Sequence, residues 1–299
     1  MTLQTVPDAT PVRTTALWPS DLLVGFRKVL SDPMGVFGLT LVSILVIMSV
    51  FAGVLAPYDP AAIDVLQRFE KPSWDHLLGT DELGRDVFSR ALYGGQTALT
   101  VAFLATFASL SIGSFLGIAA AYGPKWLDNI IVVILDTIRA YPVIILALAV
   151  GPIFGASLTT VIGILIFTSV PYYGRIVRTA ALSVLQTEYI DAEHAMGAST
   201  LRVTFKHVLP NIIGPMLIMA SMDIPVVIAA EAGLSFLGVG IKPPDTSWGL
   251  MLDQGYRFIN RTPWLVIAAG IPLIIATLGF TFLGEALRDA FDPKSQRTR

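Results

Sequence analysis

The chain has 299 residues, of which 54% are hydrophobic and only 14% are charged, whereas a typical soluble domain has about 25% charged residues. Its formal net charge of −2 argues against a nucleic-acid-binding surface, which needs a clustered basic excess. Cysteine is absent, which excludes disulfide bonds, thiolate catalysis and cysteine–zinc sites.

Long segments without Asp, Glu, Lys or Arg indicate a membrane protein. Four of them cover residues 33–58, 91–124, 140–174 and 262–284, and a spanning helix needs only about 20 apolar residues. Helices satisfy every backbone donor and acceptor internally, and the alternating pattern of a membrane barrel is missing. We therefore predict an all-α integral membrane protein with about six transmembrane helices.

The N-terminal segment, 1–33, is polar. Within it, residues 18–32 have the pattern of a short amphipathic helix on the inner membrane surface, although an ordinary polar tail fits them almost as well. The first transmembrane helix is predicted at 34–56. Its apolar run is longer than the roughly 7–15 residues of a secretory signal, so we expect it to be retained.

An extracytoplasmic loop is predicted at 57–96, because this segment holds seven acidic and four basic residues. The core, 97–284, holds five further spans, which we place near 97–121, 129–150, 157–174, 211–230 and 264–284. The uncharged run 140–174 is divided at Gly151-Pro152. In the second span, small residues recur every fourth position and predict close helix packing: Ser109, Gly113, Gly117 and Ala121.

The orientation follows from the distribution of basic residues. If the N-terminus is inside, twelve Lys and Arg residues, Arg13 among them, are cytoplasmic and seven are outside, with Arg139 within the third span. Cytoplasmic loops are enriched in these residues, which predicts cytoplasmic N- and C-termini. The remaining segments are then a cytoplasmic loop, an extracytoplasmic loop and a cytoplasmic tail, at 175–210, 231–263 and 285–299.

The cytoplasmic loop carries the most informative pattern. Residues 191–199 read DAEHAMGAS, and Leu201, Phe205, Val208 and Leu209-Pro210 follow. This spacing predicts two short amphipathic helices joined around Gly197, with Pro210 at the entry to the next span. A solvated connector is the alternative that the pattern alone leaves equally open.

This loop resembles the cytoplasmic "EAA" motif of binding-protein-dependent ABC importer permeases. In that motif an acidic-Ala-Ala segment stands six residues before a glycine, and a Leu-Pro pair follows. Glu193 replaces the usual second alanine. The resemblance implies that the loop docks on an ATPase, and that a side chain at position 197 would obstruct its turn. The docking residues would be Asp191, Ala192, Glu193, Ala195, Gly197, Ala198, Ser199, Leu201, Leu209 and Pro210.

Other stretches are similar to the dipeptide, oligopeptide and nickel branch of the same family, and specifically to its "C" type subunit. Residues 78–90 read LGTDELGRDVFSR, residues 231–238 read EAGLSFLG and residues 287–294 read LRDAFDPK; Asp136 stands before Ala140-Tyr141-Pro142. These matches occur in the order of the family, and the resemblance covers nearly everything after residue 30.

The resemblance implies a type I ABC importer permease in a bacterial cytoplasmic (inner) membrane. Its expected partners are a homologous permease subunit in a heterodimer, two cytoplasmic ATPase subunits, an extracytoplasmic substrate-binding protein and the lipid bilayer, with no nucleic acid. The chain itself has no GxxxxGK[ST] phosphate loop. Residues 79–86 share the loop's glycine spacing but lack its Lys and hydroxyl. We therefore expect no enzymatic activity, no catalytic residue and no cofactor on this chain, with ATP and Mg on the partner subunits.

Three charged residues fall within the predicted spans, where burial in lipid is costly: Asp136, Arg139 and Asp223. They are candidates for lining the pathway. Asp136 and Arg139 are three residues apart and could instead neutralise each other. The three histidines show no metal-ligand spacing, so no metal site is predicted.

Two other classes of function remain open from the residues. An ion-coupled secondary transporter would use these intramembrane charges, but it should show two repeated halves. A membrane-embedded enzyme would need a nucleophile and a base at membrane depth, and none is readable. The transported solute also stays open: peptides are implied by the resemblance, with nickel complexes and glutathione as alternatives.

Overall fold

The computed structural model describes residues 19–291, with side chains described from residue 25 onward. The predictions that concern residues 1–18 and 292–299, including Arg13 and Lys294, lie outside this range. Residues 19–291 form helices and one isolated β-bridge between Thr80 and Asp86, without a strand. The elements are α1 (Pro19–Ser31), α2 (Pro33–Val50), α3 (Ala52–Leu55), η1 (Val65–Gln67), α4 (Val87–Tyr122), α5 (Lys125–Arg139), α6 (Val143–Phe154), α7 (Leu158–Leu185), α8 (Glu188–Ala195), α9 (Thr200–Val203), η2 (Thr204–Val208), α10 (Leu209–Phe236), α11 (Trp248–Arg257) and α12 (Trp264–Phe291).

Five helical segments of the described chain are long and apolar enough to cross a membrane, and the bent pair α5 and α6 makes a sixth if it counts as one span. The five are α2, α4, α7, α12 and the continuous segment Thr200–Phe236, which contains α10. The predicted all-α membrane architecture with about six spans is therefore confirmed.

The third span differs from its prediction. A single helix over 129–150 is wrong, because α5 ends at Arg139, α6 begins at Val143 and the two axes meet at 86°. Pro142 has no N–H to donate to a helix, and its ring disfavours a helical conformation at Tyr141. The uncharged composition of this region concealed the break.

Helices α4 and α7 form the centre of the bundle and share its most extensive helix contact. A Cβ atom added to Gly113 would lie 2.6 Å from Tyr173 Cβ, and one added to Gly117 would lie 2.5 Å from the carbonyl oxygen of Gly174. The two backbones therefore touch, which confirms the small-residue face predicted from the fourfold spacing.

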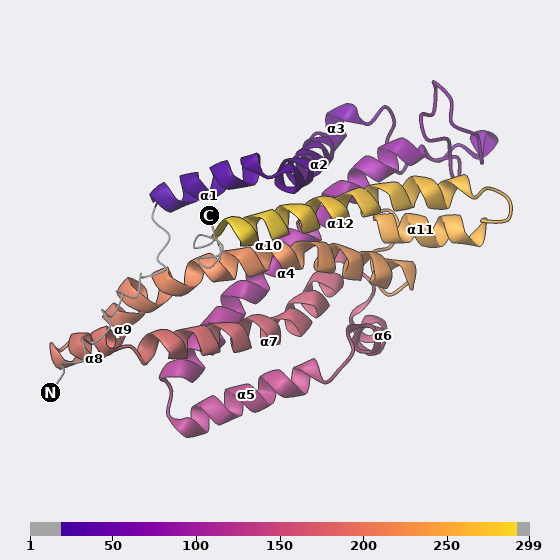
Figure 1. Cartoon of the computed structure of the whole chain (residues 1–299). Coiled ribbons are helices and arrows are strands. Elements are labelled where there is room, and N and C mark those ends of the chain that lie inside the picture. The colour runs from indigo at the N-terminus through magenta and orange to yellow at the C-terminus, as the bar shows by residue number, and fades with distance from the viewer. Residues whose placement is uncertain (1–18, 292–299) are drawn as a thin grey trace, which may run out of the picture.

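The connecting segments gather at two opposite ends of the bundle (Figure 1). At one end lie α8 and α9. At the other lie the segment between α3 and α4, and α11. Helix α1 packs beside the end of α12, where Gly25 contacts the ring of Phe291 and Lys28 Nζ donates to the carbonyl oxygen of Ala290. The predicted helix over 18–32 is thus present, and its place on a membrane surface stays a prediction.

Hydrogen bonds tie the two predicted extracytoplasmic loops into one structured cap. The indole nitrogens of Trp248 and Trp264 donate to the carbonyl oxygens of Ala91 and Leu78, each at 2.9 Å. Arg85 Nε donates to Asp81 at 2.8 Å. Arg85 also pairs with Glu82, and Asp86 pairs with His76. The charged residues of segment 79–86 therefore belong to a structured turn.

Candidate functional site

The predicted cytoplasmic loop, 175–210, contains the two short helices that its spacing indicates. Helix α8 ends at Ala195, the turn contains Gly197, and α9 begins at Thr200, followed by the π-helix η2 and α10. Gly197 has φ = +83°, the left-handed region that glycine adopts without strain. An added Cβ would meet nothing within 4 Å. A side chain at position 197 would therefore meet no neighbouring atom, but it would strain the backbone of the turn.

Buried apolar residues anchor this loop to the bundle. Ile190, Val203 and Val208 are almost fully buried in a cluster with Tyr173 and Val177 of α7. The Glu193 carboxylate lies 3.1 Å from Nε2 of His207, which links α8 to η2. Sequence reasoning missed Ile190 and Val203 as anchors, because apolar residues at this spacing occur on both faces of the short helices.

The outward side of the loop exposes three large apolar side chains, which we call the apolar tip. Met196 is 76% exposed, Leu201 70% and Phe205 67%. Around them Asp191, Ala192, Ala195, Gly197 and Ser199 are also exposed. The other predicted docking residues are partly buried: Glu193, Ala198, Leu209 and Pro210. Leu209 and Pro210 form the first turn of α10, which places them at the base of the loop. Their predicted role in docking stays a prediction.

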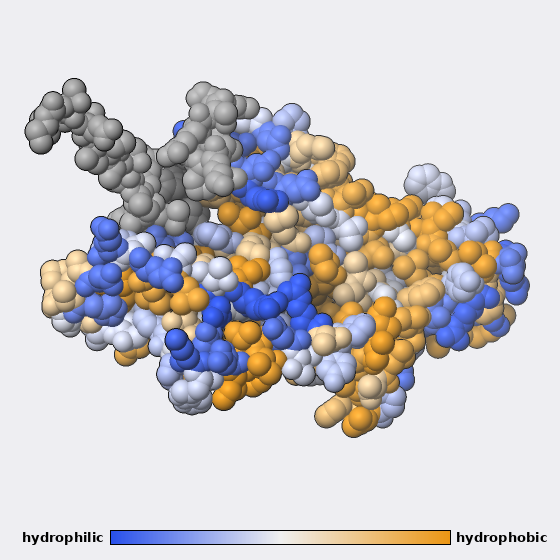
Figure 2. Space-filling model, turned by 60° about the horizontal axis from the view of Figure 1, so that its bottom comes forward, coloured by the Kyte–Doolittle hydropathy of each residue, from blue (hydrophilic) through white to orange (hydrophobic). Residues whose placement is uncertain are grey.

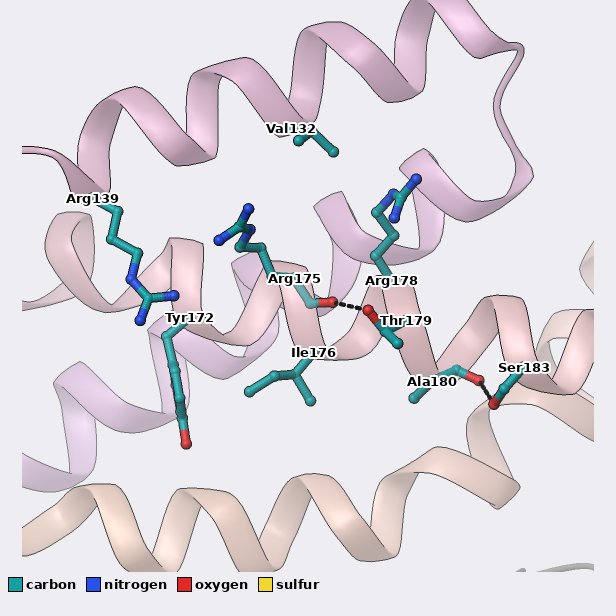
Figure 3. A pocket seen from close by; sticks show the side chains of 9 residues that line it. All are labelled: Val132, Arg139, Tyr172, Arg175, Ile176, Arg178, Thr179, Ala180 and Ser183. Atoms are coloured by element: carbon teal, nitrogen blue, oxygen red, sulfur yellow. Dashed lines mark hydrogen bonds between the residues drawn. The ribbon is translucent and has the colours of Figure 1, made fainter.

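A large cavity opens between α5 and α7, with a volume of about 670 Å³. Three arginines, Arg139, Arg175 and Arg178, converge on it (Figure 3). Arg175 lies 3.0 Å from Asp136, and Arg178 lies 2.5 Å from Asp128. Asp136 therefore pairs with α7. The predicted neutralisation between Asp136 and Arg139 is wrong, because the Arg139 side chain points toward Tyr172.

A second cavity, of about 250 Å³, contains two of the three predicted pathway residues. Arg139 and Asp223 both line it, with Thr168 and Ser169 of α7 between the two helices that carry them. Tyr173 Oη donates to Asp223 Oδ2 at 2.9 Å. The structure thus brings Arg139 and Asp223 to one cavity and leaves Asp136 in an ion pair beside it.

One face of the molecule carries a polar area among apolar ones. Figure 2 shows hydrophilic residues around a hollow, with apolar regions on both sides. Many of the apolar side chains of α5 and α6 are exposed, among them Val133, Ile134, Ile145 and Leu148. A polar hollow within an apolar surface is what a polar pathway through a membrane protein requires.

The five or six candidate spans of the described residues define a multi-pass membrane protein. Residues 113–297 match the model of the family "Binding-protein-dependent transport system inner membrane component", and residues 24–72 match "N-terminal TM domain of oligopeptide transport permease C". The chain belongs to the family of binding-protein-dependent transport system inner membrane components.

Two similar proteins have names that agree with this family assignment. The dipeptide transport system permease protein DppC of Alkalihalophilus pseudofirmus is 35% identical over 269 residues, which cover 90% of this chain and 88% of the relative. A putative peptide transport system permease protein of Brucella suis is 38% identical over 255 residues, which cover 84% and 86%. The predicted membership of the peptide permease branch is confirmed.

A solved structure supports the fold. An inward-facing form of the MetNI methionine ABC transporter matches with a TM-score of 0.58 and 21% identity, over 68% of this chain and 96% of that one. The predicted type I ABC importer permease architecture is therefore confirmed.

Proposed function

We propose that this chain forms half of the translocation pathway of an ATP-driven importer for di- or oligopeptides. The observation that carries the proposal is the exposed coupling loop, α8 to α9, anchored on α7 in a chain whose relatives are named peptide permeases. Its location would be the bacterial cytoplasmic membrane, with the chain ends and the coupling loop inside.

The other half of the pathway would come from a homologous permease subunit. Two cytoplasmic ATPases would bind ATP and Mg, so this chain would itself hold no cofactor and catalyse no hydrolysis. The apolar tip formed by Met196, Leu201 and Phe205, with the surrounding loop residues, would seat on one of them. An extracytoplasmic binding protein would deliver the peptide to the structured cap.

The anchoring of the loop suggests how a movement of the ATPases would be transmitted to the pathway. Ile190 and Val203 pack against the same helix, α7, whose arginines line the cavity. A movement of the docked loop would therefore shift α7 relative to α5 and switch the cavity between outward and inward access. Arg139 and Asp223 are our pathway candidates, with Asp136 as the partner of Arg175.

Uptake in cells tests the substrate. We expect deletion of the gene to abolish energy-dependent uptake of a labelled dipeptide or tripeptide, and the wild-type gene to restore it. Unlabelled peptides should compete, whereas glutathione and a nickel chelate should not. Retained peptide uptake in the deletion strain, or a defect confined to glutathione or nickel, would contradict the peptide assignment.

A further inference from the structure

The charges around the two cavities leave one cation and one anion without an ion-pair partner. Arg175 and Arg178 are each paired with an aspartate of α5. Among residues 25–291, Arg139 has neither a hydrogen-bond nor an ion-pair partner, and Asp223 has only the hydroxyl of Tyr173 as a side-chain partner. One guanidinium and one carboxylate are therefore available to form an ion pair with a solute in these cavities.

The two cavities follow one another along α7. The smaller is lined by Leu165, Thr168 and Ser169, and the larger by the segment of α7 from Tyr172 to Ser183. Arg139 lines both and thus lies where they meet, as Figure 3 shows for the larger cavity. Asp223 lines the smaller cavity from the middle of α10.

Arg139 and Asp223 reach the smaller cavity from two different helices. Arg139 is the last residue of α5, and both α5 and α10 pack against α7. No ion pair joins Arg139 to Asp223 in the described chain, although they share a cavity. Two opposite charges that line one cavity without pairing are complementary to a solute that carries both charges.

We propose that Arg139 and Asp223 form a transit site for zwitterionic solutes, in which Arg139 receives a carboxylate and Asp223 an ammonium group. A charged peptide terminus loses water when it enters a cavity at membrane depth, which is costly without a partner. A guanidinium offers paired donors that match a carboxylate. The free termini of a peptide supply both groups. The inference rests on the proposed function and names the chemistry that its pathway recognises.

The test uses the complete importer reconstituted in vesicles, with saturating peptide-loaded binding protein outside. Uptake of a labelled tripeptide and ATP hydrolysis are measured together, and their ratio reports passage through the permease. The variants are Arg139→Gln, Arg139→Lys, Asp223→Asn and Asp223→Glu. Arg27→Gln is the matched control, because Arg27 is exposed on α1, away from both cavities.

We expect Arg139→Gln and Asp223→Asn to lower the uptake per ATP about tenfold, the effect of losing one charge-assisted hydrogen-bonded contact. Arg139→Lys and Asp223→Glu should recover much of it, and Arg27→Gln should equal the wild type. In Arg139→Gln, the C-terminal amide of the tripeptide should lose less uptake than the free acid.

Two results would overturn the transit site. One is an unchanged uptake per ATP in both neutral variants. The other is that Arg139→Lys and Asp223→Glu lose as much uptake per ATP as the neutral variants. The shape of each side chain, and not its charge, would then be what matters. Failure of the proposed function would look different, because the wild-type importer would then transport no peptide at all.

Discussion

At the scale of single residues, Gly197 shows how a backbone angle supports a function. Its positive φ allows α8 and α9 to meet in a tight turn, while the open space around it leaves room for a side chain. The choice of glycine is therefore explained by conformation, and substitutions should differ by how well they tolerate the left-handed region.

Gly197→Val should impair coupling more than Gly197→Asn. A left-handed conformation costs an ordinary side chain about 1–2 kcal/mol, and asparagine adopts it more readily. We expect Val to lower ATP-driven peptide uptake about tenfold and Asn to preserve most of it, with equal amounts of both variants in the membrane. Equal activity of the two variants would contradict the conformational role.

The ion pairs of α7 show where residue-level prediction stops. Asp136 and Arg139 have a helical spacing that suggests a local pair, yet Asp136 binds Arg175 on another helix. Which side chains meet across helices depends on the rotation and register of each helix, and residue spacing within one helix indicates neither. For the same reason, the sequence analysis did not predict the ion pair between Arg178 and Asp128.

At the scale of elements, hydropathy located the spans but not the ends of the helices that contain them. The prediction ended the fourth span at 174, before Arg175, whereas α7 continues to Leu185. A charge usually marks the end of a span because it is costly in lipid. Helix α7 nevertheless continues through Arg175 and Arg178, which pair with Asp136 and Asp128 of α5. The bend between α5 and α6 was likewise hidden, although Pro142 was visible.

The contact between α4 and α7 gives a prediction of stability. Gly117→Val places a branched side chain against the backbone of Gly174 and Arg178. We expect a loss of about 1–3 kcal/mol in the free energy of unfolding, measured as a lower midpoint of thermal unfolding in detergent. Gly163→Val is the matched control on α7, because its Cβ would meet nothing within 4 Å. A similar shift in both variants would contradict the close contact.

At the scale of the whole molecule, the separation of the cap from the coupling loop predicts that the two lie on opposite sides of the membrane. The natural chain has no cysteine, so single cysteines report their own positions. Trp74 and Met196 are 95% and 76% exposed, and they suit this purpose.

We expect Trp74→Cys to react with a membrane-impermeant thiol reagent in intact cells, and Met196→Cys to react only after the membrane is opened. This is the orientation that the basic residues predict. Labelling of both cysteines from the outside, or the reverse order, would contradict the topology.

The central claim is that this chain is a permease that needs ATPase partners to transport. The most direct measurement compares uptake of a labelled peptide into vesicles that contain the chain alone with uptake into vesicles that contain the complete importer, with ATP or an ion gradient as the energy source. We predict uptake only by the complete importer and only with ATP. Uptake by the chain alone, driven by an ion gradient, would contradict the account.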